Sequence, residues 1–239
     1  MAARWRALVA PAVATLIGLA ILVALGLWQL QRLAWKEALI AAVAQRAGAP
    51  PSELAPAEAW SALNPGDYEY AHVRARGVYD GSRTALVFRA LERARGRYAG
   101  QGYLVMTPLK LASGGTALVN RGFVPADRKD QIGAPAGEVE VTGLMRASEP
   151  RNFFTPPDDP AHGQWYTRDV GAMATFFKLD GPAPFFIDAD AGAPGELPQG
   201  GETILAFPNN HLEYALTWFG VALALAGVFA AYAVAQLRR

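Results

Sequence analysis

The chain has 239 residues, of which 52% are hydrophobic, and its formal net charge is only +1. This near-neutral balance argues against a nucleic-acid-binding protein, which normally presents a basic surface. The chain contains no cysteine, which excludes disulfides, thiolate catalysis and cysteine-ligated zinc or iron–sulfur centres. Its only histidines are His72, His162 and His211, so a multi-histidine metal site would need nearly all of them.

The first apolar segment, residues 7–30, carries no charge, and Gln29 is its only strongly polar residue. The segment exceeds the roughly 20 residues that are needed to cross a hydrocarbon core. A cleaved signal peptide would have a shorter apolar region and a small-residue cleavage site, whereas this segment runs into Trp28 and Arg32. We therefore expect a retained transmembrane helix over 7–30, in which Gly18 and Gly26 indicate close helix packing.

Residues 33–210 are expected to form one β-rich domain. A helical stretch over 33–45 continues the first span, and a Pro/Ala linker follows at 49–57. Gly114-Gly115 is a hairpin signal between two candidate strands. The predicted fold class is a membrane α+β protein, in which two terminal transmembrane helices flank a mostly antiparallel sheet or partial barrel with short helices. The expected strands are 68–78, 84–91, 102–111, 116–124, 138–146, 164–167 and 184–188, and the expected short helices are 127–131 and 170–179.

The second apolar segment, residues 214–237, predicts a second transmembrane helix, and Gly220 and Gly227 share one of its faces. Two spans place both termini on the same side of the membrane. Arginines flank both ends of the chain, and basic residues favour the cytoplasmic side. We therefore expect a multi-pass protein of the bacterial inner membrane, with cytoplasmic termini and a periplasmic central domain. The flanking arginines are Arg4, Arg6, Arg238 and Arg239.

A search for catalytic motifs yields no convincing acid–base pair or nucleophile elbow. Asp188 and Asp190 could bind a cation through oxygen, but no calcium loop surrounds them, so a turn is favoured. The arginines at 89, 93, 95 and 97 could face anionic lipid or a partner, although a solvated loop is the commoner case. A membrane-tethered periplasmic enzyme is therefore disfavoured, and a channel or transporter would need more spans.

A polar segment ending in His211 precedes the second span, and Tyr214 and Trp218 share a helical face with this histidine. The first helix leaves the membrane where the second enters, so Arg32 and Lys36 can approach His211. An axial nitrogen, aromatic walls and cations for carboxylates would together form a haem cradle. An interfacial anchor of aromatic and basic side chains explains the same residues, and both interpretations stay open.

These residues belong to a series of motifs that runs along the chain in a characteristic order. The series resembles the surfeit-locus protein 1 family, also called Shy proteins, over essentially the whole chain. The motifs are Gly26-Leu27-Trp28-Gln29-Leu30-Gln31-Arg32, Trp35-Lys36, Gly77-Val78-Tyr79-Asp80, Gly102-Tyr103, Thr107-Pro108-Leu109, Leu118-Val119-Asn120-Arg121-Gly122-Phe123-Val124-Pro125, Asn209-Asn210-His211-Leu212 and Tyr214-Ala215-Leu216-Thr217-Trp218-Phe219.

The resemblance implies a membrane assembly factor of cytochrome c oxidase that assists maturation of the haem-A-containing subunit I, and no catalysis. Some bacterial members are thought to bind haem a through the histidine of the closing motif. Carried over, this makes His211 the metal ligand, with Tyr214 and Trp218 as pocket walls. Arg32 as a partner of a haem propionate is an inference from helix geometry alone. The implied partners are subunit I, the lipid bilayer and, as a further candidate, haem A synthase.

A family member could also act as a scaffolding chaperone for subunit I without haem. In that case His211 is a helix-start residue near a cap formed by Asn209 or Asn210. His72 and His162 match no motif of the family and are not assigned a ligand role. Asn120-Arg121-Gly122 is expected to fix a strand end and its turn, with an unusual backbone angle at the glycine and internal pairing of the arginine.

Overall fold

The computed structural model describes residues 2–238, with side chains described from Leu8 onward. Two compact units divide the chain: residues 43–205 form one, and the residues up to 42 together with those from 206 form the other. Each unit is described by itself. The predicted basic flanks at Arg4, Arg6 and Arg239 lie outside the described side chains.

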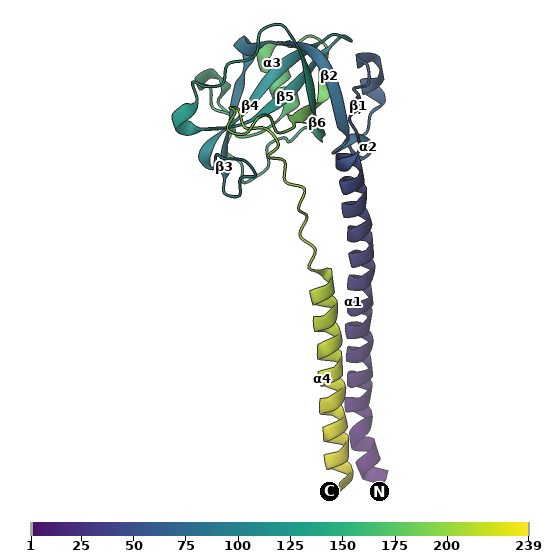
Figure 1. Cartoon of the computed structure of the whole chain (residues 1–239). Helices are drawn as coiled ribbons and strands as arrows, with labels where there is room; N and C mark the ends of the chain where they lie inside the picture. The colour runs from purple at the N-terminus through teal and green to yellow at the C-terminus, as the bar shows by residue number, and fades with distance from the viewer. Residues whose placement is uncertain (1, 239) are drawn as a thin grey trace. The chain divides into compact units, whose positions relative to one another are not determined.

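The unit formed by the two ends of the chain consists mainly of two long helices, the first of which continues into the other unit. Helix α1 spans Ala2–Gly48 and helix α4 spans His211–Arg238, and both are long and apolar enough to cross a membrane. At 1.5 Å per residue, α1 is about 70 Å long, more than twice the roughly 30 Å of a hydrocarbon core. The predicted continuation of the first span over 33–45 is confirmed, because α1 is one unbroken helix (Figure 1).

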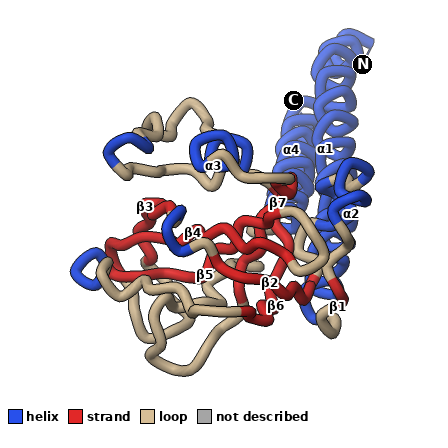
Figure 2. The backbone as a smooth tube through the Cα atoms, turned by 90° about the horizontal axis from the view of Figure 1, so that it is seen from above, coloured by secondary structure: helices blue, strands red, loops and turns tan. Residues whose placement is uncertain are grey.

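The two helices pack antiparallel and side by side (Figures 1 and 2). A Cβ atom added to Gly26 would lie 2.5 Å from the Phe219 ring, and one added to Gly18 would lie 3.0 Å from Leu225. The predicted close packing at these two glycines is therefore confirmed. The corresponding prediction for α4 is wrong, since nothing lies within 4 Å of a Cβ at Gly220 or Gly227. Alanines take their place: the buried small residues of α4 are Ala215 and Ala222.

Substituting Gly26→Leu should push the helices apart, because the new side chain would occupy the space of the Phe219 ring. Overpacking of this kind costs about 1–3 kcal/mol. Since the chain has no cysteine, the pair Gly18→Cys and Leu225→Cys reports helix proximity by disulfide formation in membranes. We expect Gly26→Leu to reduce crosslinking clearly. Gly227→Leu should leave the yield of crosslinked protein unchanged. Equal yields in the two variants would contradict this packing.

The compact unit of residues 43–205 is built on one sheet with the strand order β1-β2-β6-β7-β5-β4-β3. An additional pairing of β2 with β4 joins the sheet into a ring of strands, with β1 and β3 attached at its ends. All pairings are antiparallel except β1 with β2 and β5 with β7, so the prediction of a mostly antiparallel, partly closed barrel is confirmed (Figure 2). The strands are β1 Ser52–Glu53, β2 His72–Tyr79, β3 Ala85–Leu91, β4 Gly100–Leu111, β5 Thr116–Pro125, β6 Glu138–Ala147 and β7 Pro182–Ala189.

The predicted strands have counterparts in the sheet, except for 164–167. This segment makes only isolated bridges, because the Asp158 carboxylate accepts hydrogen bonds from the backbone of Tyr166 and Thr167. The strand that was predicted to begin at Tyr68 is β2, and it begins at His72. A short helix, α2 (Pro65–Tyr68), lies just before it. Helix α3, Val170–Phe177, confirms the later short helix, and a 3₁₀ turn at Ala126–Arg128 takes the place of the earlier one.

Two hydrophobic cores lie on opposite faces of the sheet. Strand β7 contributes to both, because alternate side chains of a strand point to opposite faces: Phe185 and Ile187 belong to one core and Phe186 to the other. Trp60, from a 3₁₀ helix at Ala57–Ala62, covers the first core. Met173 of α3 covers the second.

A bulge in β5 accounts for the Asn-Arg-Gly motif. Asn120 still pairs with Asp188 of β7, whereas Phe123 pairs with Gln199. Gly122 lies between them with a φ of 127°, an angle that favours glycine. The motif had been expected at the end of a strand. It lies within β5 instead. The expected internal pairing of Arg121 is confirmed, because its guanidinium donates to the carbonyls of Ile132 and Gly133.

Candidate functional site

The first residue of α4 is joined to the one strongly polar residue of the apolar segment 7–30. Gln29 is only 9% exposed, and its Oε1 atom lies 2.8 Å from Nδ1 of His211. A buried amide needs such a partner, because polar groups without one are costly in apolar surroundings. Gln29 was not among the predicted site residues, although its isolation among apolar residues was the signal that could have identified it.

This hydrogen bond determines how His211 presents its ring. An amide oxygen accepts, so Nδ1 donates its proton to Gln29, and in the neutral form of the ring the lone pair is then on Nε2. Histidines that bind metals are held in the same way, with the non-ligating nitrogen donating to a carbonyl or carboxylate. Two residues earlier, the side-chain oxygen of Asn209 is buried and accepts no hydrogen bond within residues 2–238.

Tyr214 and Trp218, the two predicted aromatic walls, differ in their exposure. Trp218 is half-buried, and it lies seven residues, or two helical turns, after His211. Tyr214 is 54% exposed, so most of its ring lies outside the contact between the helices. A flat apolar ligand at Nε2 of His211 would therefore meet Trp218 and Tyr214 along the same side of α4.

The predicted cations of the first helix engage aromatic rings. The Arg32 guanidinium lies 4.3 Å from the centre of the Trp35 ring, and the Lys36 amine lies 5.6 Å from the Phe207 ring. In the described part of the chain, no hydrogen bond or ion pair joins Arg32 to His211. The structure thus brings Gln29 to His211, while the exposed Arg32 lies one helical turn further along α1.

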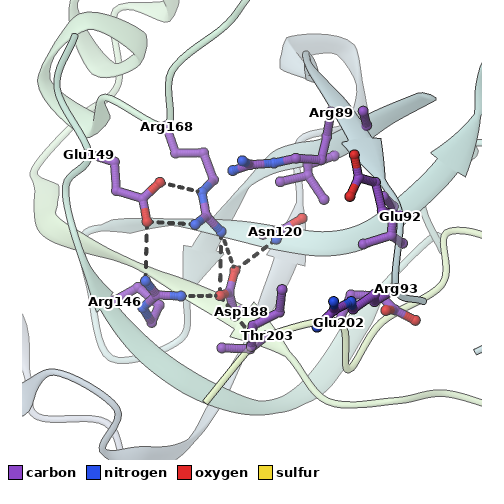
Figure 3. A pocket seen from close by; sticks show the side chains of 14 residues that line it. Arg89, Glu92, Arg93, Asn120, Arg146, Glu149, Arg168, Asp188, Glu202 and Thr203 are labelled. Atoms are coloured by element: carbon purple, nitrogen blue, oxygen red, sulfur yellow. Dashed lines mark hydrogen bonds and ion pairs between the residues drawn. The ribbon is translucent and has the colours of Figure 1, made fainter. Parts of the chain in front are cut away.

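A second polar cluster lies in the barrel unit and centres on Asp188, which is only 3% exposed (Figure 3). Its carboxylate accepts from Arg146 at 2.9 Å and from Arg168 at 3.1 Å. Asn120 donates to it at 2.7 Å and Thr203 at 2.8 Å. The carboxylate is therefore saturated by protein donors, which contradicts its possible role as a cation ligand.

Both arginines of this cluster have further partners. Arg146 and Arg168 both donate to Glu149, at 3.1 and 2.6 Å, and Arg146 also donates to Glu69. Burial opposes the charge of Arg146, but Asp188 and Glu69 outweigh it and raise its pKa. This network was not predicted, because its members come from segments that are distant in sequence. Within residues 2–238, no group of three or more acidic or histidine side chains could hold a metal ion.

Replacing Asp188→Asn should destabilise the barrel unit, because two largely buried guanidinium groups lose a shared carboxylate. Breaking a buried ion pair from one side costs about 3–5 kcal/mol. The matched control is Glu140→Gln, since Glu140 also pairs with two arginines but is 44% exposed. We expect a change below about 1 kcal/mol for this control. Chemical unfolding of the purified protein gives both values, and equal effects would refute the importance of burial.

His72 lies at the start of β2 between two acceptors. Its Nδ1 lies 2.8 Å from the Ala49 carbonyl and its Nε2 lies 2.8 Å from Asp190. Two acceptors favour the doubly protonated ring. Burial opposes this charge, but the hydrogen bonds to Asp190 and Ala49 outweigh it and raise the pKa of His72 above its ordinary value of 6.5. The Asp190 carboxylate thus pairs with His72. Both carboxylates that were considered as cation ligands, Asp188 and Asp190, therefore have protein partners.

The raised pKa predicts a pH-dependent contribution of His72 to stability. A group whose pKa is higher in the folded state contributes fully below its unfolded value, here about 6.5. The contribution is lost as the pH rises through the folded pKa. We therefore expect the stability difference between the natural protein and His72→Gln to shrink as the pH rises above about 6.5. Unfolding curves at several pH values test this, and a constant difference would contradict it.

Comparison with known proteins covers both units. Residues 16–223 match the model of the SURF1 family. The chain is 38% identical over 216 residues to Surfeit locus protein 1 of Mus musculus, across 84% of this chain and 68% of that protein. The Homo sapiens protein of the same name is 37% identical over 217 residues, across 84% and 70%. A SURF1-like protein of Drosophila melanogaster is 33% identical over 216 residues, across 84% and 70%. The family match includes both Gln29 and His211.

Proposed function

Because the chain belongs to the SURF1 family, a family of cytochrome c oxidase assembly factors, we propose that it assists maturation of the haem-A-containing subunit I by binding and delivering haem a. The observation that carries this proposal is the hydrogen bond between His211 and Gln29. It leaves Nε2 of His211 as the atom able to bind iron. No residue is proposed to act in catalysis.

The residues around His211 suit a transient cargo. A single neutral imidazole supplies one axial ligand, and haem supplies an iron centre that accepts it. Trp218 and Tyr214 would offer aromatic surface to the macrocycle. Arg32, whose guanidinium lies over the Trp35 ring, is proposed to pair with a propionate. A site at the end of an apolar helix pair can open toward a partner, which favours delivery over permanent retention.

We also propose the arrangement in the membrane. The two apolar helices would both cross a bacterial inner membrane, and the barrel unit would lie in the periplasm. Arg238 at the end of α4 supports a cytoplasmic carboxyl terminus, since basic flanks favour that side. The proposed partners are subunit I and haem A synthase, which would receive and supply the cargo.

A second function rests on the same hydrogen bond. The bond between Gln29 and His211 also ties α1 to the start of α4, as interhelical hydrogen bonds do in membrane proteins. In a scaffolding chaperone for subunit I, His211 would serve only this purpose. The two functions differ in one property, which is the binding of haem by the purified protein.

Haem binding should therefore depend on His211. We expect the protein, purified from cells that synthesise haem A, to give a haem a signal in its visible spectrum and pyridine haemochrome. His211→Ala should abolish most of that signal, because the imidazoles of His72 and His162 already pair with Asp190 and Asp159. His162→Ala is the matched control, since His162 is an exposed residue that pairs only with Asp159.

Gln29→Leu separates the two roles of the histidine further. Loss of the amide removes the acceptor for Nδ1 and should weaken haem retention about 10- to 100-fold, as loss of outer partners does at metal sites. A folded natural protein that carries no haem beside an active synthase would reject delivery. Assembly of the oxidase with normal haem content in His211→Ala cells would favour the scaffold instead.

A further inference from the structure

A pocket of about 490 Å³ opens beside the Asp188 cluster in the barrel unit (Figure 3). This volume lies within the range of small-molecule sites. One side of the pocket consists of the hydrogen-bonded network of Arg146, Arg168, Glu149 and Asp188, and another of the end of β3 and the residues after it. The function proposed above does not use this pocket.

The network leaves out two arginines of this pocket, Arg93 and Arg89, and Arg89 is the one beside Arg168. In Figure 3 its guanidinium points toward Arg168. Within residues 2–238, no carboxylate lies within 4 Å of the Arg89 guanidinium, although Asp188 and Glu149 are close by. Those two carboxylates are already engaged by Arg146 and Arg168, so they are poorly placed to serve a third guanidinium.

A negatively charged ligand would stabilise the charged guanidinium of Arg89 in these surroundings. Arg89 is an exposed residue, but partial desolvation of its guanidinium and the nearby charge of Arg168 lower its pKa, and the contributions of Glu149 and Asp188 only partly offset them. Arginine nonetheless stays charged at neutral pH. An arginine fork without a partner matches the planar geometry of a carboxylate or the oxygens of a phosphate.

The remaining lining residues indicate the rest of the ligand. Leu91, Leu104 and Ile204 present apolar surface to the pocket. Glu202 also lines it, but its carboxylate accepts from the backbone amides of Arg95 and Gly96. We propose that this pocket binds an organic anion, in which a carboxylate or phosphate group pairs with Arg89 and an apolar portion lies against the leucines.

Glu92 is the one acidic side chain of the pocket that makes no hydrogen bond or ion pair within residues 2–238. Its carboxylate would repel an anionic ligand, so its removal should favour binding. The pocket can therefore be tested with two substitutions, one that removes a positive charge and one that removes a negative charge. Arg89→Gln should weaken binding, and Glu92→Gln should leave it unchanged or strengthen it.

The test uses the full chain in phosphatidylcholine nanodiscs, with benzoate as the anionic probe and benzamide as its uncharged analogue. Titration followed by ligand NMR should show saturable binding of benzoate and at least about tenfold weaker binding of benzamide. Arg89→Gln should weaken benzoate binding by at least about tenfold, because a charge-assisted bond is lost. Lys110→Gln, the same charge change at an exposed position of β4, should leave it unaltered.

Three results would overturn the proposal: no saturable benzoate binding, equal binding of benzamide, or equal binding by Arg89→Gln. The Arg89 side chain makes no hydrogen bond within the described residues, and unfolding curves verify that this variant is folded. Nanodiscs that contain phosphatidic acid then distinguish two sources of the anion. A lipid headgroup in the pocket would compete with benzoate in the natural protein, whereas a water-soluble ligand predicts no competition.

Discussion

A polar side chain on an apolar helix needs a hydrogen-bond partner, and this requirement governs the helical unit. Gln29 is the only strongly polar residue of a 24-residue apolar segment, from 7 to 30, and it meets the first residue of α4. Once this pair is fixed, antiparallel packing brings Gly26 to Phe219 and Gly18 to Leu225. One hydrogen bond therefore defines both the register of the helices and the orientation of His211.

Much of this architecture could be predicted from the sequence, because apolar length and alternating strands are local signals. The hairpin at Gly114-Gly115 and the helical continuation of the first span are examples of this kind. Pairing across distance was not accessible in the same way. Gly220 and Gly227 were expected to pack, but which face of α4 meets α1 depends on a partner that lies far away in sequence.

The remaining differences arise where side chains override local preferences. The segment 164–167 has strand-like residues, yet Asp158 takes up its backbone donors. The Asp188 cluster was missed for a related reason, since its residues come from β5, β6, β7 and from several segments outside the strands. The family motifs indicated His211, but the role of Gln29 became visible only when the two helices were seen together.

The polar clusters around Asp188 and His211 illustrate different uses of buried polarity. Around Asp188, carboxylates and guanidiniums satisfy one another, and the result is a rigid junction between strands that are distant in sequence. At His211 only one ring nitrogen is hydrogen-bonded, because Nε2 has no protein partner in the described chain. Saturated networks suit structure, whereas an unsatisfied atom held in a fixed orientation suits binding.

The unbroken course of α1 has a consequence for how the chain tolerates changes in length. A single residue inserted between Arg32 and Gly48 would turn the two flanking parts of the helix by about 100° relative to each other, because each helical residue contributes that angle. The segment 202–210, which has no regular secondary structure, would absorb the same insertion as slack. An insertion in α1 therefore changes which side chains share a face of that helix, whereas an insertion in 202–210 leaves the faces of both helices unchanged.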